Sequence, residues 1–268
     1  MRRATAARSL RRRWPSLLPW ILPLAILVLW WGSVELGIFA AYQLPRPPAV
    51  LDAAVGLWRR GLLLQDALAT VGRVVVGFTI GSALAIALGT VTGLSRRVEQ
   101  AVEPTLQAFR TVPSLAWAPL LLLWLGIDEP PKLTLVAIGA FFPVYVNLVS
   151  GIKNVDRKLV EVARVYGLRG PEIAWRVVLP ASLPSLLTGL RLGLSQAWLF
   201  VVVAEFFLGA SAGLGFRLTD SQQSSRVDLM FVALITVAVL GKLSDTLLRA
   251  VERRVLRWRD TLGTERTA

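Results

Sequence analysis

The stretch from Gly72 to Leu94 reads GRVVVGFTIGSALAIALGTVTGL and holds one charged residue, Arg73. An α-helix rises about 1.5 Å per residue, so about 20 apolar residues cross the hydrocarbon core of a bilayer. The stretch therefore predicts a membrane-spanning helix. Its glycines form two small-xxx-small pairs, which allow neighbouring helices to pack closely: Gly77, Gly81, Gly89 and Gly93.

Further apolar stretches of similar length lie on both sides of this one. The chain of 268 residues is 54% apolar and 18% charged, whereas soluble domains are about 45–50% apolar and about 25% charged. Hydropathy and length predict six spans over residues 17–39, 72–94, 106–125, 133–152, 183–208 and 229–248. We therefore predict an all-α membrane protein with about six transmembrane helices. It would have a basic N-terminal tail (1–16), a six-span domain (17–250) and a C-terminal tail (251–268).

Basic residues are distributed unevenly among the predicted loops. Of the 30 Lys and Arg residues, 20 lie in four regions: 2–13, 95–105, 152–183 and 249–268. Because Lys and Arg accumulate in cytoplasmic loops, we predict that these regions and both termini are cytoplasmic. A cleaved signal peptide is the alternative reading of the first apolar stretch. That stretch is longer than a typical signal-peptide core, so we expect a retained span.

The sequence contains neither cysteine nor histidine. Disulfide and thiolate chemistry are thereby excluded, and the commonest general base and metal ligand are missing. We therefore expect no catalytic residue and no metal site. The net charge of +13 would suit nucleic acid. However, the basic residues flank apolar spans, where they favour anionic lipid headgroups, so we expect membrane lipid and no nucleic acid as a partner.

A loop of about thirty residues, 153–182, separates the fourth and fifth predicted spans. It reads Glu161-Val162-Ala163-Arg164-Val165-Tyr166-Gly167 and, nine residues later, Val177-Val178-Leu179-Pro180. Gly167 can adopt the left-handed conformation that ends a helix, and Pro171 suits the first turn of a second helix. Pro180 is expected to stop that helix before the fifth span. The pattern predicts a helix–turn–helix elbow in which Ala163 leaves a shallow face for another protein.

This loop resembles the EAA loop of binding-protein-dependent ABC importer permeases. The resemblance implies a type I importer permease fold, in which the loop forms a coupling helix that sits in a groove of a cytoplasmic ATPase. The coupling residues would be Glu161, Val162, Ala163, Gly167, Leu179 and Pro180. Glu161 would pair with a basic residue of the ATPase and Gly167 would set the turn. Val162 stands where the family usually has a second alanine.

The resemblance also implies partners and a mechanism. A second copy of the chain would complete the pore, an extracytoplasmic solute-binding protein would deliver the cargo, and an ATPase dimer would drive alternating access. ATP and Mg²⁺ would be bound by the ATPase. This chain would bind no cofactor of its own, since its sequence contains no Gly-x4-Gly-Lys-Ser/Thr loop.

Four further motifs resemble the nitrate/sulfonate/taurine branch of that family. They are residues 109–119 (FRTVPSLAWAP), residues 141–147 (FFPVYVN), Gly189-Leu190-Arg191, and Ala197-Trp198-Leu199 with Ala204-Glu205. Aliphatic sulfonate permeases resemble the chain most within this branch. The resemblance implies import of a small anion, an aliphatic sulfonate, across the inner membrane of a bacterium. Taurine, nitrate and a pyrimidine vitamin precursor remain alternatives.

Several ionisable residues fall within the predicted spans or at their ends, where they usually face a bundle interior or an aqueous path. Arg73, Arg110 and Lys242 lie near segment ends and are expected to snorkel to the interface. For Arg191 and Glu205, an ion pair and a role in the solute pathway are both open. The candidate pathway residues are Arg191, Glu205, Trp117, Tyr145 and Trp198, with packing as the alternative for the three aromatic side chains.

Two rival classes of protein remain to be weighed. An ion-driven secondary transporter would show paired broken helices or an inverted repeat, and neither is apparent in the sequence. It would also have no need of a docking elbow. An integral-membrane enzyme would need a catalytic constellation, which a chain without Cys or His scarcely offers. We therefore expect a transport subunit and not an enzyme.

Overall fold

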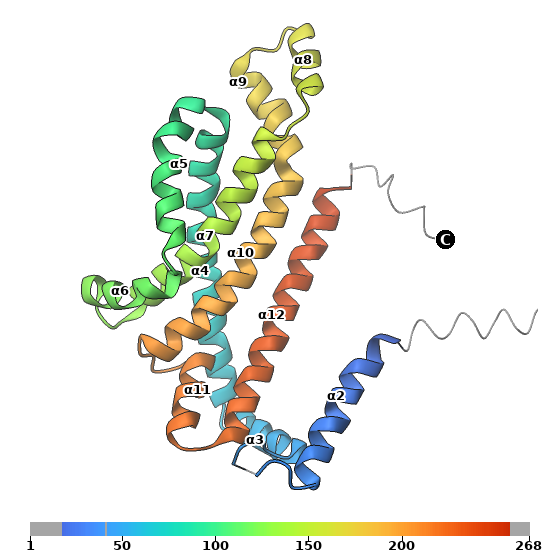
Figure 1. Ribbon diagram of the computed structural model, residues 1–268, viewed down its shortest axis with the longest axis vertical. Helices are drawn as coiled ribbons and strands as arrows, with labels where there is room; N and C mark the ends of the chain where they lie inside the picture. Colours follow the sequence, from blue (N-terminus) through green and yellow to red (C-terminus); the bar gives the residue numbers. More distant parts are fainter. Residues whose placement is uncertain (1–17, 41, 258–268) are drawn as a thin grey trace, which may run out of the picture.

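The computed structural model of the protein describes residues 18–40 and 42–257, which form helices and loops without a β-strand. The predicted tail 1–16, Leu17 and residues 258–268 lie outside the described residues. The helices are α2 (Leu18–Glu35), α3 (Pro47–Arg59), α4 (Leu62–Leu94), α5 (Arg96–Thr111), α6 (Ala118–Leu125), α7 (Glu129–Lys153), α8 (Arg157–Val165), α9 (Gly170–Ile173), α10 (Leu179–Phe207), α11 (Leu214–Gln223) and α12 (Val227–Val255). A 3₁₀ turn (Ser114–Trp117) precedes α6, and a π-helical turn (Ala174–Val178) joins α9 to α10. Figure 1 shows how these elements are arranged.

The centre of the protein consists of α4, α7 and α10, with α7 packed extensively against both of the others. Small residues make this close packing feasible. A Cβ atom added to Gly81 of α4 would overlap the backbone carbonyl of Ala137 in α7, and one added to Gly189 of α10 would lie 2.8 Å from the Cβ atom of Asn147. The glycine pairs on α4 therefore serve helix packing, as their spacing predicts.

Four helices among the described residues are long and apolar enough to cross a membrane. They are α4, α7, α12 and the continuous helix Gly170–Phe207, which comprises α9, the π-helical turn and α10. The third predicted span, 106–125, is not a straight helix, because α5 and the helix that follows it meet at a bend of 85°. Counted as one broken span, this pair raises the number to five. The predicted count of six spans is therefore not matched.

The break between α5 and α6 has a local cause. Proline disfavours the α conformation in the residue before it and lacks a backbone N–H. Val112, which precedes Pro113, is extended, with φ −73° and ψ 122°. The α5 helix accordingly ends at Thr111.

The N-terminal helices contact the centre mainly through α12. The amphipathic α3 buries Val50 and Leu57 against Val232 of α12. The α2 helix meets α12 where Trp30 stacks on Phe231, with ring centroids 5.2 Å apart. Figure 1 shows α2 leaning away from the remaining helices. It ends at Glu35, four residues before the predicted end of the first span.

The two ends of the molecule carry different elements (Figure 1). The α4–α5 turn, α8, α9 and the C-terminal end of α12 lie toward one end, and α3 and α11 lie toward the other. This is the grouping that the distribution of basic residues predicts. Which side of the membrane each end faces stays a prediction.

Candidate functional site

The α8 helix ends in a Schellman motif built around Gly167. This glycine has a φ of +81°, a left-handed conformation that side chains with a Cβ atom disfavour. Its N–H donates to the carbonyl of Arg164 at 2.9 Å, and the N–H of Leu168 donates to the carbonyl of Ala163 at 3.1 Å. The predicted turn-forming conformation of Gly167 is confirmed.

The second half of the loop differs from the prediction. The α9 helix has Pro171 in its first turn, as expected, but Pro180 does not end the helix. Instead the chain passes through the π-helical turn into α10, with the N–H of Leu179 donating to the carbonyl of Ala174. This hydrogen bond runs from residue i to residue i−5, so the π-helical turn is wider than an α-helical turn. The wider turn leaves room for the ring of Pro180, which has no N–H to donate and would clash with the backbone in a regular α-helix.

We call α8, α9 and the π turn the elbow. Ala163 is only 5% exposed, so its own side chain offers little surface to a partner, and the expectation that it leaves a shallow face for docking stays a prediction. Its carbonyl belongs to the Schellman motif. The exposed face carries larger apolar groups instead, including Val162, Val165 at 87% and Tyr166 at 82% exposure. An exposed apolar cluster of this kind typically marks a protein–protein contact.

The remaining predicted coupling residues lie around this face. Glu161 is exposed and forms no ion pair with the described residues. Leu179 is half-buried and Pro180 is exposed at the base of the elbow, where α10 begins. Figure 1 shows α8 and α9 beyond the ends of α7 and α10.

Two candidate pathway residues connect α10 to α12 within the chain. The Arg191 guanidinium forms ion pairs with Asp245 and Glu252, each at 3.4 Å. The indole Nε1–H of Trp198 donates to Oγ of Ser244 at 2.8 Å, and the ring is almost completely buried.

The other two aromatic candidates lie near the broken span. Trp117 packs against Phe109, with ring centroids 5.6 Å apart. Tyr145 is buried in α7, and its hydroxyl donates to the Glu103 carboxylate of α5 at 3.1 Å. Both side chains thus contact α5.

Glu205 pairs with Arg73 and not with Arg191. Its side chain has no exposed surface, and one carboxylate oxygen lies 2.7 Å from Nη1 of Arg73. The Thr70 hydroxyl and the N–H of Gly215 also donate to this carboxylate, at 2.9 and 2.8 Å. Such complete hydrogen bonding is what makes a buried charge tolerable.

Arg73 holds a second carboxylate as well. Its Nε and Nη2 atoms each donate to Glu129 at 2.7 Å, and Nη1 also donates to the carbonyl of Ala212. The expectation that Arg73 snorkels to the interface is therefore wrong. Because α4 begins at Leu62 and not at the predicted start of the span, Arg73 lies inside the helix and faces the protein. We call Thr70, Arg73, Glu129 and Glu205 the Arg73 cluster.

A second buried pair extends this cluster. Asp66 accepts from Nε of Arg217 at 2.8 Å and from the N–H of Gly213 at 3.0 Å. On the α7 side, Nζ of Lys132 donates to the carbonyl of Gly209 at 2.8 Å. Together with the Arg73 cluster, these bonds pin the α10–α11 turn onto α4 and α7.

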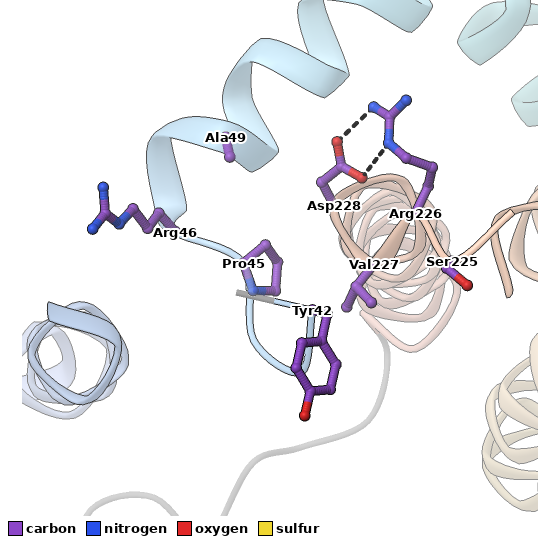
Figure 2. A pocket seen from close by; sticks show the side chains of 8 residues that line it. All are labelled: Tyr42, Pro45, Arg46, Ala49, Ser225, Arg226, Val227 and Asp228. Atoms are coloured by element: carbon purple, nitrogen blue, oxygen red, sulfur yellow. Dashed lines mark hydrogen bonds and ion pairs between the residues drawn. The ribbon is translucent and has the colours of Figure 1, made fainter. Parts of the chain in front are cut away.

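A cavity of about 320 Å³ lies at the same end, between the α2–α3 loop and the start of α12. Figure 2 shows the side chains that line it, among them Tyr42, Arg46, Arg226 and Asp228. Arg226 donates twice to Asp228, at 2.9 and 2.7 Å, and this carboxylate raises the pKa of the guanidinium above its ordinary value. Because Arg226 is already paired, the cavity offers little attraction to a charged ligand.

The family described as "binding-protein-dependent transport system inner membrane component" matches residues 77–257. The chain belongs to this permease family. The match includes the elbow, α7, α10 and α12, and most of α4. The chain is thus a subunit of a binding-protein-dependent importer and a multi-pass membrane protein.

Individual relatives cover nearly the whole permease. It is 41% identical to the putative aliphatic sulfonates transport permease SsuC of Bacillus subtilis (strain 168), over 94% of this chain and 91% of that protein. It is 41% identical to the protein of the same name in Escherichia coli (strain K12), over 90% and 91%. At lower identity it is similar to the taurine transport permease TauC of Escherichia coli (30%, over 94% of both chains) and to the nitrate import permease NrtB of Synechocystis (32%, over 87% of both chains).

A solved structure has the same fold. A chain of the inward-facing MetNI methionine ABC transporter superposes with a TM-score of 0.57 at 20% sequence identity, over 71% of this permease and 96% of that chain. The permease therefore has the type I importer fold. The expected fold class is confirmed, apart from the number of spans.

Proposed function

We propose that this permease imports a small organic anion, an aliphatic sulfonate, into a bacterial cell. Two copies of the chain would form the pore, and a solute-binding protein would deliver the cargo from outside. Both termini and the elbow would face the cytoplasm, where an ATPase dimer binds ATP and Mg²⁺. The two relatives at 41% identity, both named as aliphatic sulfonate permeases, support this choice of cargo.

The observation that carries the coupling proposal is the exposed apolar face of the elbow. Val165 and Tyr166 project from a helix end that a Schellman motif fixes in one conformation. Such a preformed and largely exposed apolar surface suits insertion into a groove of another protein, because little ordering entropy is lost on binding. Glu161 lies beside it and is available for a basic residue of the ATPase.

The mechanism that follows is alternating access. ATP binding would bring the two ATPase subunits together and draw the two elbows with them, which would open the pore toward the binding protein. Hydrolysis would reverse this movement. The elbow connects the end of α7 to the start of α10, so its displacement would act on both central helices.

The test is reconstitution with the partners. The permease is co-expressed with its cognate ATPase, purified in detergent and placed in liposomes with the binding protein. We expect the ATPase to co-purify, and we expect ATP-dependent uptake of ³⁵S-labelled ethanesulfonate. Excess unlabelled taurine or nitrate that abolished this uptake would assign the cargo to one of those anions instead.

The coupling surface is tested by substitution. Glu161→Arg and Tyr166→Ala are expected to reduce recovery of the ATPase, because one reverses a charge and the other removes an apolar anchor. Asp52→Arg is the matched control, since Asp52 is an exposed acidic residue on α3 at the opposite end of the molecule. Unchanged recovery with both elbow variants would refute the docking site. Uptake driven by an ion gradient without ATP would support a secondary transporter.

A further inference from the structure

The break between α5 and α6 exposes backbone that a bilayer cannot satisfy. Thr111, Val112 and Pro113 are all exposed in the described chain, and the helix bends by 85° at this point. Lipid offers no hydrogen bonds, so irregular backbone at membrane depth is found where protein buries it or where it lines a water-filled cavity. This segment must therefore face water or another protein chain.

A polar cleft adjoins the break. It has a volume of about 270 Å³, lies between α5 and α7, and runs to the end of α7 at which the elbow begins. The residues that line it are Glu103, Arg110, Tyr145, Val146, Val149, Ser150, Lys153 and Asn154. Arg110 is the lining residue nearest to the break in the sequence and comes two positions before Val112.

Two of the three charged side chains that line this cleft have side-chain partners among the described residues. The Lys153 ammonium contacts Glu99, and the Glu103 carboxylate accepts the hydroxyl of Tyr145. Arg110, in contrast, forms no ion pair and no side-chain hydrogen bond with the described residues. A cation in this position, beside a polar cleft, is available to a mobile anion.

We propose that the α5–α7 cleft is part of the aqueous path of the cargo, and that Arg110 is the side chain that attracts its anionic group. This inference rests on the proposed function and specifies where the anion passes. A guanidinium presents parallel N–H donors that match two oxygens of a sulfonate, as they match those of a carboxylate or phosphate. A single exposed cation holds an anion loosely, which conduction requires, because a tightly held ion would not leave.

The absence of cysteine from the chain provides a direct test of accessibility. An Arg110→Cys variant carries a single thiol, and methanethiosulfonate reagents modify a thiol only as the thiolate, which forms in water. In the assembled importer in liposomes, we expect modification by both the sulfonatoethyl and the trimethylammonioethyl reagent, measured on the permease. Arg97→Cys, at the exposed start of α5, is the control that should react with both reagents. Val239→Cys, on the exposed apolar face of α12, is the control that should not react, because lipid is expected to cover it. An Arg110→Cys thiol that resists both reagents would overturn the proposal.

Transport tests the role of the charge. Arg110→Gln is expected to reduce ethanesulfonate uptake by about tenfold, because the attraction of one charge at about 4 Å is worth a factor of about 5 in water and a larger factor at a protein-surface dielectric constant. Arg110→Lys should retain more uptake than Arg110→Gln. Arg97→Gln removes an equivalent charge from the same helix and should transport normally. Co-purification of the ATPase with each variant shows that the variants are folded and assembled.

Chemical rescue separates charge from shape. After Arg110→Cys has lost uptake, the trimethylammonioethyl reagent restores a positive charge and should raise uptake, whereas the sulfonatoethyl reagent should not. Equal uptake by Arg110→Gln and the unmodified permease would overturn the role of Arg110. If the unmodified permease carried no ethanesulfonate, the proposed cargo would fail. Thiol modification would still decide whether the cleft contains water.

Discussion

The two carboxylates bound by Arg73 offer a comparison in which burial is the main difference. The Glu205 side chain is completely buried, whereas the Glu129 side chain is 52% exposed. In Glu205→Gln, an amide with one accepting oxygen replaces a carboxylate that accepts from Thr70, Arg73 and Gly215. The change costs about 1.5–3 kcal/mol for the lost charged hydrogen bond and about 1–3 kcal/mol for the donor left unpaired. We expect a loss of about 3–5 kcal/mol in the free energy of unfolding, as for other broken buried pairs.

The same substitution at Glu129 should cost far less. Water can replace the carboxylate there, and Arg73 keeps its bond to Glu205, so we expect about 0–1 kcal/mol. The assay is thermal unfolding of the purified permease in detergent, followed by the fluorescence of its ten tryptophans. For a chain of this size the expected difference in Tm between the two variants is on the order of 10 °C.

The outcome is decided by the comparison between the variants. Equal losses of Tm in Glu205→Gln and Glu129→Gln would contradict the argument that burial sets the cost. A loss below about 2 °C in Glu205→Gln would show that the Arg73 cluster does not hold the α10–α11 turn in place. Asp245→Asn, which removes a partly exposed partner of Arg191 and Arg249, provides a further reference for a weakly stabilising ion pair.

Two further predictions follow from the backbone. Gly81→Leu should lower the Tm in the same assay by several degrees, because α4 must move away from α7, and overpacking of this kind costs about 1–3 kcal/mol. Gly72→Leu is its control, since a Cβ atom there would have no neighbour within 4 Å. Gly167→Val should cost about 1–2 kcal/mol in the elbow, because a side chain resists the left-handed φ, and it should weaken ATPase binding by about tenfold, measured by titration. Gly170→Val, where φ is not left-handed, should bind normally.

The four long helices could be predicted from the sequence because apolar length is a local property. The Arg73 cluster could not, because hydropathy alone placed the start of the second span ten residues beyond the actual start of α4. Within those residues a signal was present: Asp66, Thr70 and Arg73 are spaced i, i+4 and i+7 and so share one helix face. The partners of that face come from α7, α10 and α11, which are distant in sequence and are brought close only by the fold.

The two prolines show why local rules gave mixed results. Pro113 breaks a helix inside an apolar run that predicted a continuous span, and the residue before it becomes extended, as proline requires. Pro180 was expected to end a helix, yet a π-helical turn accommodates it and the helix continues. The proline ring imposes the same local restrictions in both places. The preceding turn, which depends on tertiary packing, decides the result.

The connection between the elbow and the cleft follows from the packing of α7 and α10. The elbow joins these two helices, and Gly189 and Gly193 of α10 hold them in close backbone contact. Closely packed helices move together, because interiors at this density deform little. A displacement of the elbow would therefore move α7 and α10 together as one rigid body. The flexible joint of this movement would then lie outside the α7–α10 pair. We expect the break at Val112 and Pro113, where the chain bends by 85°, to act as such a joint. Since the α5–α7 cleft lies between the rigid pair and the broken span, the same movement would change the width of the cleft beside Arg110.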